Sequence, residues 1–202
     1  MESMDAQVFW NVIEIYNSQS IIIQIGLFIL LILAIVVSYM QKINWLAKFA
    51  LGIINLFICF DFFALYGTEP IQKYFAMPLY LLCGLLFLYE SWHSKNDVIR
   101  KPDILQTALL ALYLLYPFVS LLSGNSFPQM TTYIMPCPVV SLSITVYSGY
   151  KNKNKLLLAL LTLWGLTGIK FNVYEDLILL ICGLYGAVVL FNEIKALKRN
   201  KS

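Results

Sequence analysis

Long runs of apolar residues, separated by short polar connections, make up most of the chain from residue 20 onward. A hydrocarbon core about 30 Å thick is crossed by about 20 helical residues rising 1.5 Å each. Runs of this kind recur, and the pattern predicts seven membrane-spanning helices. They cover residues 20–40, 45–66, 74–92, 104–123, 132–150, 155–169 and 174–194. The expected fold is an all-α seven-transmembrane-helix bundle, with residues 1–202 forming a single membrane domain.

The fifth and sixth predicted spans have the weakest pattern. The fifth contains Pro136 and Pro138, and the sixth, residues 155–169, is short. Short or proline-broken spans persist only where protein or a water-filled cavity satisfies the freed backbone groups. We therefore expect neighbouring protein or such a cavity beside both.

Residues 1–19 have a different pattern. Their apolar side chains share one helical face: Val8, Phe9, Val12, Ile15 and Tyr16. This spacing predicts an amphipathic helix lying along the outer membrane surface. A cleavable signal peptide is not expected, because the leader is acidic and the first apolar run is too long.

The basic residues indicate an orientation. Of the 14 lysine and arginine residues, only Lys73 and Lys170 fall on one predicted side. The others fall on the opposite side: Lys42, Lys48, Lys95, Arg100, Lys101, Lys151, Lys153, Lys155, Lys195, Lys198, Arg199 and Lys201. Because cytoplasmic connections are enriched in lysine and arginine, this predicts the N-terminus outside and the C-terminus in the cytoplasm.

The composition agrees with a membrane protein. The chain is 60% hydrophobic and 12% charged, against about 25% charged in soluble domains. The partner it implies is the lipid bilayer, and a net charge of +3 does not indicate nucleic acid. Four cysteines lie at irregular spacing inside apolar runs, and His93 is the single histidine. That pattern predicts no disulfide framework, no zinc site and no cofactor.

The most unusual stretch is Met135-Pro136-Cys137-Pro138 in the fifth predicted span. Two prolines remove two backbone donors and free carbonyls upstream, which broken transporter helices use to bind ions or solutes. Cys137 adds a soft ligand or a nucleophile. The alternative is structural: the helix begins at Pro138 after an extended segment, and Cys137 only packs.

Three acids fall at a similar depth in the outer third. Asp61 lies inside the second predicted span, where an ionisable group needs a partner or water. Glu175 and Asp176 open the seventh span, where acids also stabilise a helix N-terminus. One wet pocket shared with Cys137 would explain all three, and an outer acidic surface would concentrate cations. On the inner side, Glu90 beside Trp92 is expected to be solvated.

Three motifs carry a resemblance to a known family: Tyr16-Asn17 with Gln24, Met135-Pro136-Cys137-Pro138, and Val173-Tyr174-Glu175-Asp176-Leu177. In their order and spacing, the chain resembles a family of bacterial multi-pass membrane proteins of about this length, classed as a domain of unknown function. That family follows Pro-Cys-Pro with two threonines, where this chain has Val139 and Val140, so no role is expected for hydroxyls there. The resemblance covers nearly the whole chain. It implies the bacterial cytoplasmic (inner) membrane and no particular activity.

Three functions are compatible with these features. The first is a small-solute or cation transporter or channel, with a site formed by Asp61, Pro136, Cys137, Pro138, Glu175 and Asp176. The second is an accessory or structural subunit, assembled with a partner membrane subunit or with copies of itself. The third is a thiol-dependent membrane enzyme using Cys137, although no serine–histidine or cysteine–histidine constellation supports it.

Overall fold

The computed structural model describes residues 2–170 and 173–199, so Lys201 of the predicted basic tail lies outside the described residues. The described residues form helices and connections without a β-strand. The α-helices are α1 (Glu2–Tyr39), α2 (Leu46–Phe57), α3 (Met77–His93), α4 (Ile104–Leu122), α5 (Pro136–Ser148), α6 (Lys155–Leu166) and α7 (Glu175–Arg199). The predicted all-helical fold is therefore confirmed, with a helix in each of the seven apolar runs.

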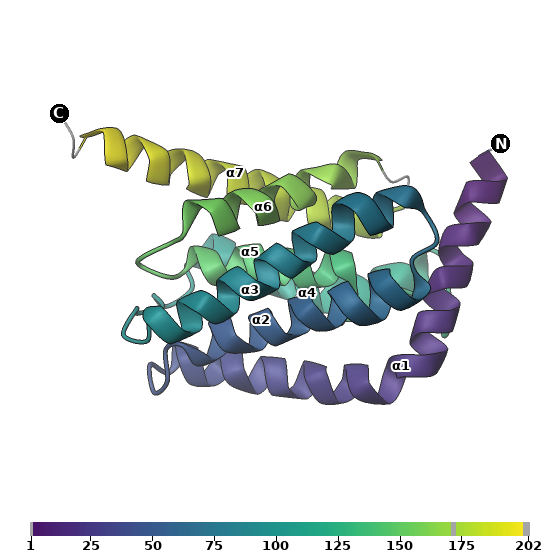
Figure 1. The fold of residues 1–202 in the computed structure, drawn as a ribbon, viewed down its shortest axis with the longest axis horizontal. Coiled ribbons are helices and arrows are strands. Elements are labelled where there is room, and N and C mark those ends of the chain that lie inside the picture. Colours follow the sequence, from purple (N-terminus) through teal and green to yellow (C-terminus); the bar gives the residue numbers. More distant parts are fainter. Residues whose placement is uncertain (1, 171–172, 200–202) are drawn as a thin grey trace.

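The helices lie side by side in a bundle (Figure 1), and the residues at its two ends differ in charge. The connections 40–45, 94–103 and 149–154 lie at one end with the C-terminus, and they carry most of the lysines and arginines. We call this the basic end. The opposite end holds the N-terminus and the connection 67–71. Asp61 lies a few residues before this connection, and Glu175 begins α7 at the same end. We call it the acidic end.

Among the described residues, five helical segments are long and apolar enough to cross a membrane: Phe9–Tyr39, Leu46–Tyr66, Gln72–His93, Ile104–Leu122 and Glu175–Ala196. The other two apolar helices are shorter, Pro136–Ser148 and Lys155–Ile169. The 13 residues of α5 rise only about 20 Å, less than a hydrocarbon core of about 30 Å. Seven complete crossings therefore stay a prediction.

The predicted boundary between a surface helix and the first span falls inside α1, which continues from Glu2 to Tyr39. The helix bends there, and its N-terminal arm crosses the acidic end of the bundle (Figure 1). The Ser20 hydroxyl donates to the Tyr16 carbonyl oxygen, 2.6 Å away, and bonds of this kind bend helices. Val12 and Ile13 on this arm are buried against the bundle, whereas Ile15 is 49% exposed.

The second apolar run changes its helical form along its length. After α2 the chain continues as a π-helix from Ile58 to Tyr66, and a second π-helix, Gln72–Ala76, leads into α3. π-Helical turns are uncommon and are often found at functional sites. The wider turn carries Asp61 near the acidic end.

Helix α5 is the centre of the bundle. Every residue from Pro138 to Tyr147 is buried, as is Pro136. Met135 is extended at the N-cap, with φ −128° and ψ 164°, so the helix begins at Pro136. The predicted span of 132–150 began too early, and the alternative start at Pro138 was too late. A proline is tolerated in a first helical turn because its missing N–H would have no intrahelical partner there.

Candidate functional site

The extended chain before α5 and the first residue of the helix, Pro136, are held by side chains from three other helices. Tyr16 of α1 donates to the Ile134 carbonyl oxygen. Tyr80 of α3 donates to the Pro136 carbonyl oxygen at 2.6 Å. Tyr113 of α4 donates to the Tyr133 carbonyl oxygen at 3.3 Å. Upstream carbonyls that were expected to be available for a ligand therefore accept bonds from tyrosines in this structure.

A second group of bonds fixes the same connection to α1. The Asn17 amide donates to the carbonyl oxygens of Pro128 and Met130, at 2.7 and 2.8 Å. The Thr132 hydroxyl donates to Gln24 Oε1 at 2.7 Å. Asn17 and Gln24 are themselves linked by a 3.2 Å hydrogen bond. Buried polar side chains on a membrane helix thus replace the water that irregular backbone would otherwise need.

The N-terminal turns of α5 and α7 bring together three of the predicted site residues. The Cys137 thiol lies close to the Asp176 carboxyl group, and Glu175 lies near enough to interact electrostatically with both. Glu175 is 2% exposed and Asp176 is 4% exposed. Two buried acids beside a thiol make this region electrostatically favourable for positive charge. They do not favour a thiolate nucleophile, which needs positive charge nearby.

Glu175 is incompletely satisfied. Its Oε1 atom accepts one long bond, 3.5 Å, from the Asn125 amide. Its Oε2 atom is buried and accepts no hydrogen bond within the described part of the chain. A buried carboxylate oxygen without a donor is costly, so this atom marks a place where a proton or cation would be bound favourably.

Asp61 lies against α1 at the same end of the bundle. It is half-buried, and its side chain interacts with Ser20 and Tyr16 of α1. It also lines an open depression of about 530 Å³ whose other walls are apolar, among them Ile53 and Phe57. Its neighbours on α1 and α2 differ from the neighbours of Cys137 on α7. The structure therefore does not bring Asp61 into the Cys137–Asp176 contact.

A polar stripe on α5 continues from Cys137 toward the basic end. Cys137, Ser141 and Thr145 are spaced by four residues and so share one helical face. The Ser141 hydroxyl is 2.8 Å from the Tyr116 hydroxyl, and the Thr145 hydroxyl is 4.0 Å from Cys182 Sγ on α7. This face lies against α4 and α7 and connects the acid pair with the middle of the bundle.

The basic end contains a buried ionic network that the sequence did not predict. Lys48 Nζ lies 3.0 Å from Glu90 Oε2 and 2.8 Å from Asp97 Oδ2. Glu90 is 6% exposed, so the expectation that it is solvated was wrong. Glu90 faces the bundle because Tyr147 of α5 donates to it at 2.6 Å. The sequence signal for this network was the position of Lys48, which lies inside the second apolar run, three residues after its start at Trp45.

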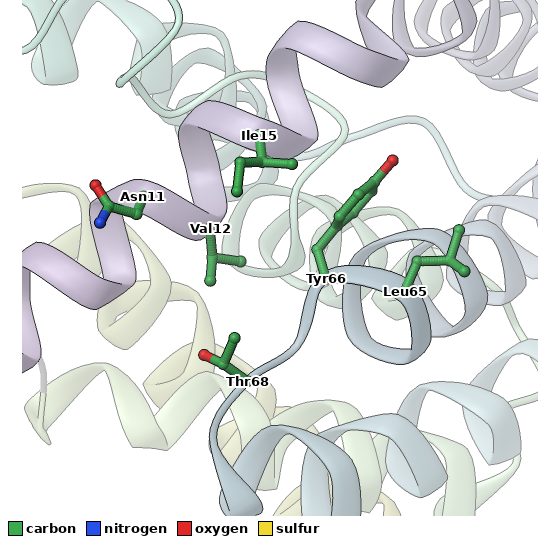
Figure 2. A pocket seen from close by; sticks show the side chains of 6 residues that line it. All are labelled: Asn11, Val12, Ile15, Leu65, Tyr66 and Thr68. Atoms are coloured by element: carbon green, nitrogen blue, oxygen red, sulfur yellow. The ribbon is translucent and has the colours of Figure 1, made fainter.

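A smaller depression lies between the N-terminal arm of α1 and the end of the first π-helix. Figure 2 shows the residues that line it: Asn11, Val12, Ile15, Leu65, Tyr66 and Thr68. The volume of the depression is about 370 Å³. Its lining has no charged side chain. Within residues 2–170 and 173–199, no group of three or more histidine, cysteine and acidic residues could hold a metal ion.

Comparison with known proteins identifies a family. Residues 6–201 match the family model described as "Family of unknown function (DUF6064)". The chain belongs to DUF6064. No curated protein and no solved structure matches this DUF6064 chain. The membership agrees with the resemblance to a family of unknown function drawn from the sequence.

The three motifs that carried this resemblance meet at the acidic end of the DUF6064 chain. Tyr16 and Asn17 bind the connection before α5. The Pro-Cys-Pro motif opens α5, and Cys137 contacts Asp176 of the third motif. Segments far apart in sequence thus form one buried polar region.

Proposed function

We propose that this membrane protein moves a small cation, above all a proton, across the bilayer, and that the buried carboxyl groups of Glu175 and Asp176, beside Cys137, are its outer binding site. The observation that carries the proposal is the burial of two adjacent carboxyl groups, one with an oxygen that accepts no hydrogen bond among the described residues. Ionisable groups inside a membrane bundle are expensive and commonly mark ion pathways or proton relays. The orientation follows the basic connections, with the acidic end outside the bacterial cytoplasmic membrane and the basic end in the cytoplasm.

The same geometry supports the proposal of a pathway along α5. The hydroxyl groups of Ser141 and Thr145 lie on the same face of α5 as Cys137, one and two turns closer to the basic end, and each lies beside a polar partner on α4 or α7. Hydroxyl groups can both donate and accept, so they can coordinate a small cation or pass a proton. The tight burial of α5 favours a proton or a small ion over a sugar-sized solute.

The proposal is tested by flux into liposomes that contain the purified protein. Gradients of protons and of lithium, sodium, potassium and ammonium ions are applied in turn, and uptake is followed with ion-sensitive dyes. We expect the wild type to move at least one of these ions, and Asp176→Asn to lose most of that flux. Glu69→Gln, at an exposed acid of the same end, is the matched control and should keep it. Absence of flux for every ion, or equal flux in Asp176→Asn, would overturn the proposal.

Asp61 favours a second candidate function, that of a subunit in a larger membrane assembly. Its Oδ2 atom accepts no hydrogen bond among the described residues, and it borders an apolar depression. A donor on another transmembrane helix would satisfy it. Extraction in polymer nanodiscs followed by native mass spectrometry tests this. The wild-type protein should be found bound to a second copy of itself or to another polypeptide, and the Asp61→Asn variant should have lost that partner. If both proteins are found as monomers, this candidate function is excluded.

A further inference from the structure

Lys48 occupies the centre of a site built from two carboxylates at the basic end. Its side chain is fully buried, on α2, and its ammonium group lies between Glu90 of α3 and Asp97 of the 94–103 connection. The Tyr150 ring adds a cation–π contact, with its centroid 4.3 Å from Lys48 Nζ. The surroundings of this ammonium are those expected for a bound cation.

The two carboxylates are held in place independently of Lys48. Glu90 Oε1 accepts bonds from the Tyr147 hydroxyl at 2.6 Å and from the Asn154 backbone N–H at 3.1 Å. Asp97 Oδ1 accepts two bonds from Asn152, one from its backbone N–H and one from its amide, both 3.1 Å. In each carboxylate, one oxygen is anchored and the other faces the ammonium group.

The oxygens that face Lys48 are not equivalent. Asp97 Oδ2 accepts a hydrogen bond from Lys48. Glu90 Oε2, buried in a residue that is 6% exposed, accepts no hydrogen bond within the described residues and meets Lys48 only as an ion pair. Two carboxylates therefore share one ammonium group, which leaves a buried net negative charge at this site.

We infer that Glu90 and Asp97 form a binding site for a monovalent cation, and that Lys48 is its resident occupant in this closed form. A free cation binds when the Lys48 side chain withdraws, because the anchored carboxylates and the aromatic faces stay in place. The site lies at the basic end of the bundle, beside the C-terminal end of α5, and the outer site lies at the N-terminal end of the same helix. Its role as the inner binding site of the pathway rests on the proposed function, whereas cation binding here does not.

A clasp between two connections closes the site toward the cytoplasm. Ile99 and Tyr150 form an antiparallel bridge. The Arg100 N–H donates to the Gly149 carbonyl oxygen at 2.9 Å, and the Lys151 N–H donates to the Val98 carbonyl oxygen at 3.1 Å. Asp97 directly precedes this clasp and accepts two hydrogen bonds from Asn152 on the facing connection, so the closed clasp holds the Asp97 carboxylate in the site.

The test uses the purified full chain with Lys48→Ala, which leaves both carboxylates without their ammonium partner. Thermal unfolding is measured in methylammonium, sodium and potassium chloride, with N-methylglucamine chloride at equal ionic strength as the control, because that cation is too large for the space vacated. We expect a saturable rise in Tm of about 5 °C at a hundredfold excess over Kd. Lys48→Ala with Asp97→Asn should lose it. A rise no larger than in N-methylglucamine chloride overturns the inference.

If Lys48→Ala does not fold, labelling of the wild type decides. A small amine-reactive reagent is applied in the same salts, and modification of Lys48 is measured by mass spectrometry. A bound cation should displace Lys48 and increase its labelling several-fold over the N-methylglucamine control. Unchanged labelling overturns the inference. Neither readout measures flux. If flux in Asp176→Asn equals that of the wild type and the outer-site proposal fails, the cation site at Glu90 and Asp97 is therefore not affected by that result.

Discussion

The hydroxyl of Tyr16 on α1 donates to the carbonyl oxygen of Ile134, just before α5. In a continuous helix this carbonyl would accept from the residue four positions later, which is Pro138 and has no N–H. A side chain 118 positions away in the sequence thus supplies the bond that the Pro-Cys-Pro motif removes. This contact explains how an irregular segment is buried inside an apolar bundle.

Replacing Tyr16 with phenylalanine should therefore destabilise the protein. The change leaves a buried carbonyl without a donor, and we expect a loss of about 1–3 kcal/mol in the free energy of unfolding. Tyr74→Phe is the matched control, because Tyr74 is 84% exposed, and it should change stability little. The measurement is reversible unfolding in mixed detergent micelles. Equal stability of Tyr16→Phe and Tyr74→Phe would contradict the importance of this bond.

The Asn17 amide should control the order of the connection before α5. Asn17→Ala removes the bonds to the Pro128 and Met130 carbonyl oxygens, so local opening of residues 126–132 should become easier. Hydrogen–deuterium exchange of this segment should be faster than in the wild type. Asn11→Ala, on the exposed side of the same arm, should leave exchange there unchanged. Unchanged protection in Asn17→Ala would show that the connection is ordered by other contacts.

The contact of α6 with α7 should not tolerate a methyl group. A Cβ atom at Gly183 would lie 2.5 Å from the Gly165 carbonyl carbon and 2.7 Å from Leu166 N, and both are backbone atoms that cannot move aside. Gly183→Ala should cost about 1–3 kcal/mol through separation of the helices.

Gly26→Ala is the control for this prediction, since a Cβ atom there meets nothing within 4 Å. It should be neutral or stabilise by about 0.5–1 kcal/mol, because alanine favours a helix interior over glycine. Unfolding of both variants is compared in the same micelles. If Gly183→Ala is no less stable than Gly26→Ala, the close approach of α6 to α7 is wrong.

The proposed orientation is tested in intact cells. Single cysteines replace Ser126 and Lys151, exposed residues of the connections on either side of α5, in a chain whose four native cysteines are replaced by alanine. A membrane-impermeant thiol reagent should label the cysteine at 126 only. Labelling at 151 in intact cells would reverse the orientation, and labelling of both positions would exclude a crossing by α5.

The sequence predicted the helices better than their contacts. Apolar runs of helical length identify the spans because hydrocarbon demands internally bonded backbone. The start of α5 was missed by four residues, since nothing local shows that Tyr16, Tyr80 and Asn17 satisfy the chain before Pro136. The continuity of α1 was missed as well, because a bend and a break leave the same polar interruption in the pattern.

The candidate site itself stays a prediction, and the structure bears only on which of its residues lie together. Cys137 and Asp176 do meet, as their shared depth suggested, but depth along the bundle does not say which side of it a residue faces, and Asp61 faces α1. The Lys48–Glu90–Asp97 network was missed because its members are 42 and 49 positions apart in the chain, counted from Lys48. Only tertiary packing of α2 against α3 shows that this lysine is buried.

The position of α5 has a consequence for how the protein is made. A helix of 13 residues that carries Ser141, Ser143 and Thr145 and has nearly every side chain against protein gains little from contact with lipid. It is therefore poorly suited to pass from the translocation machinery into lipid by itself, as a longer and more apolar segment can. We expect it to be stably placed only after α6 and α7, which follow it in the chain and pack against it, have been made. The centre of the folded bundle is thus one of the last parts of the chain to settle in the membrane.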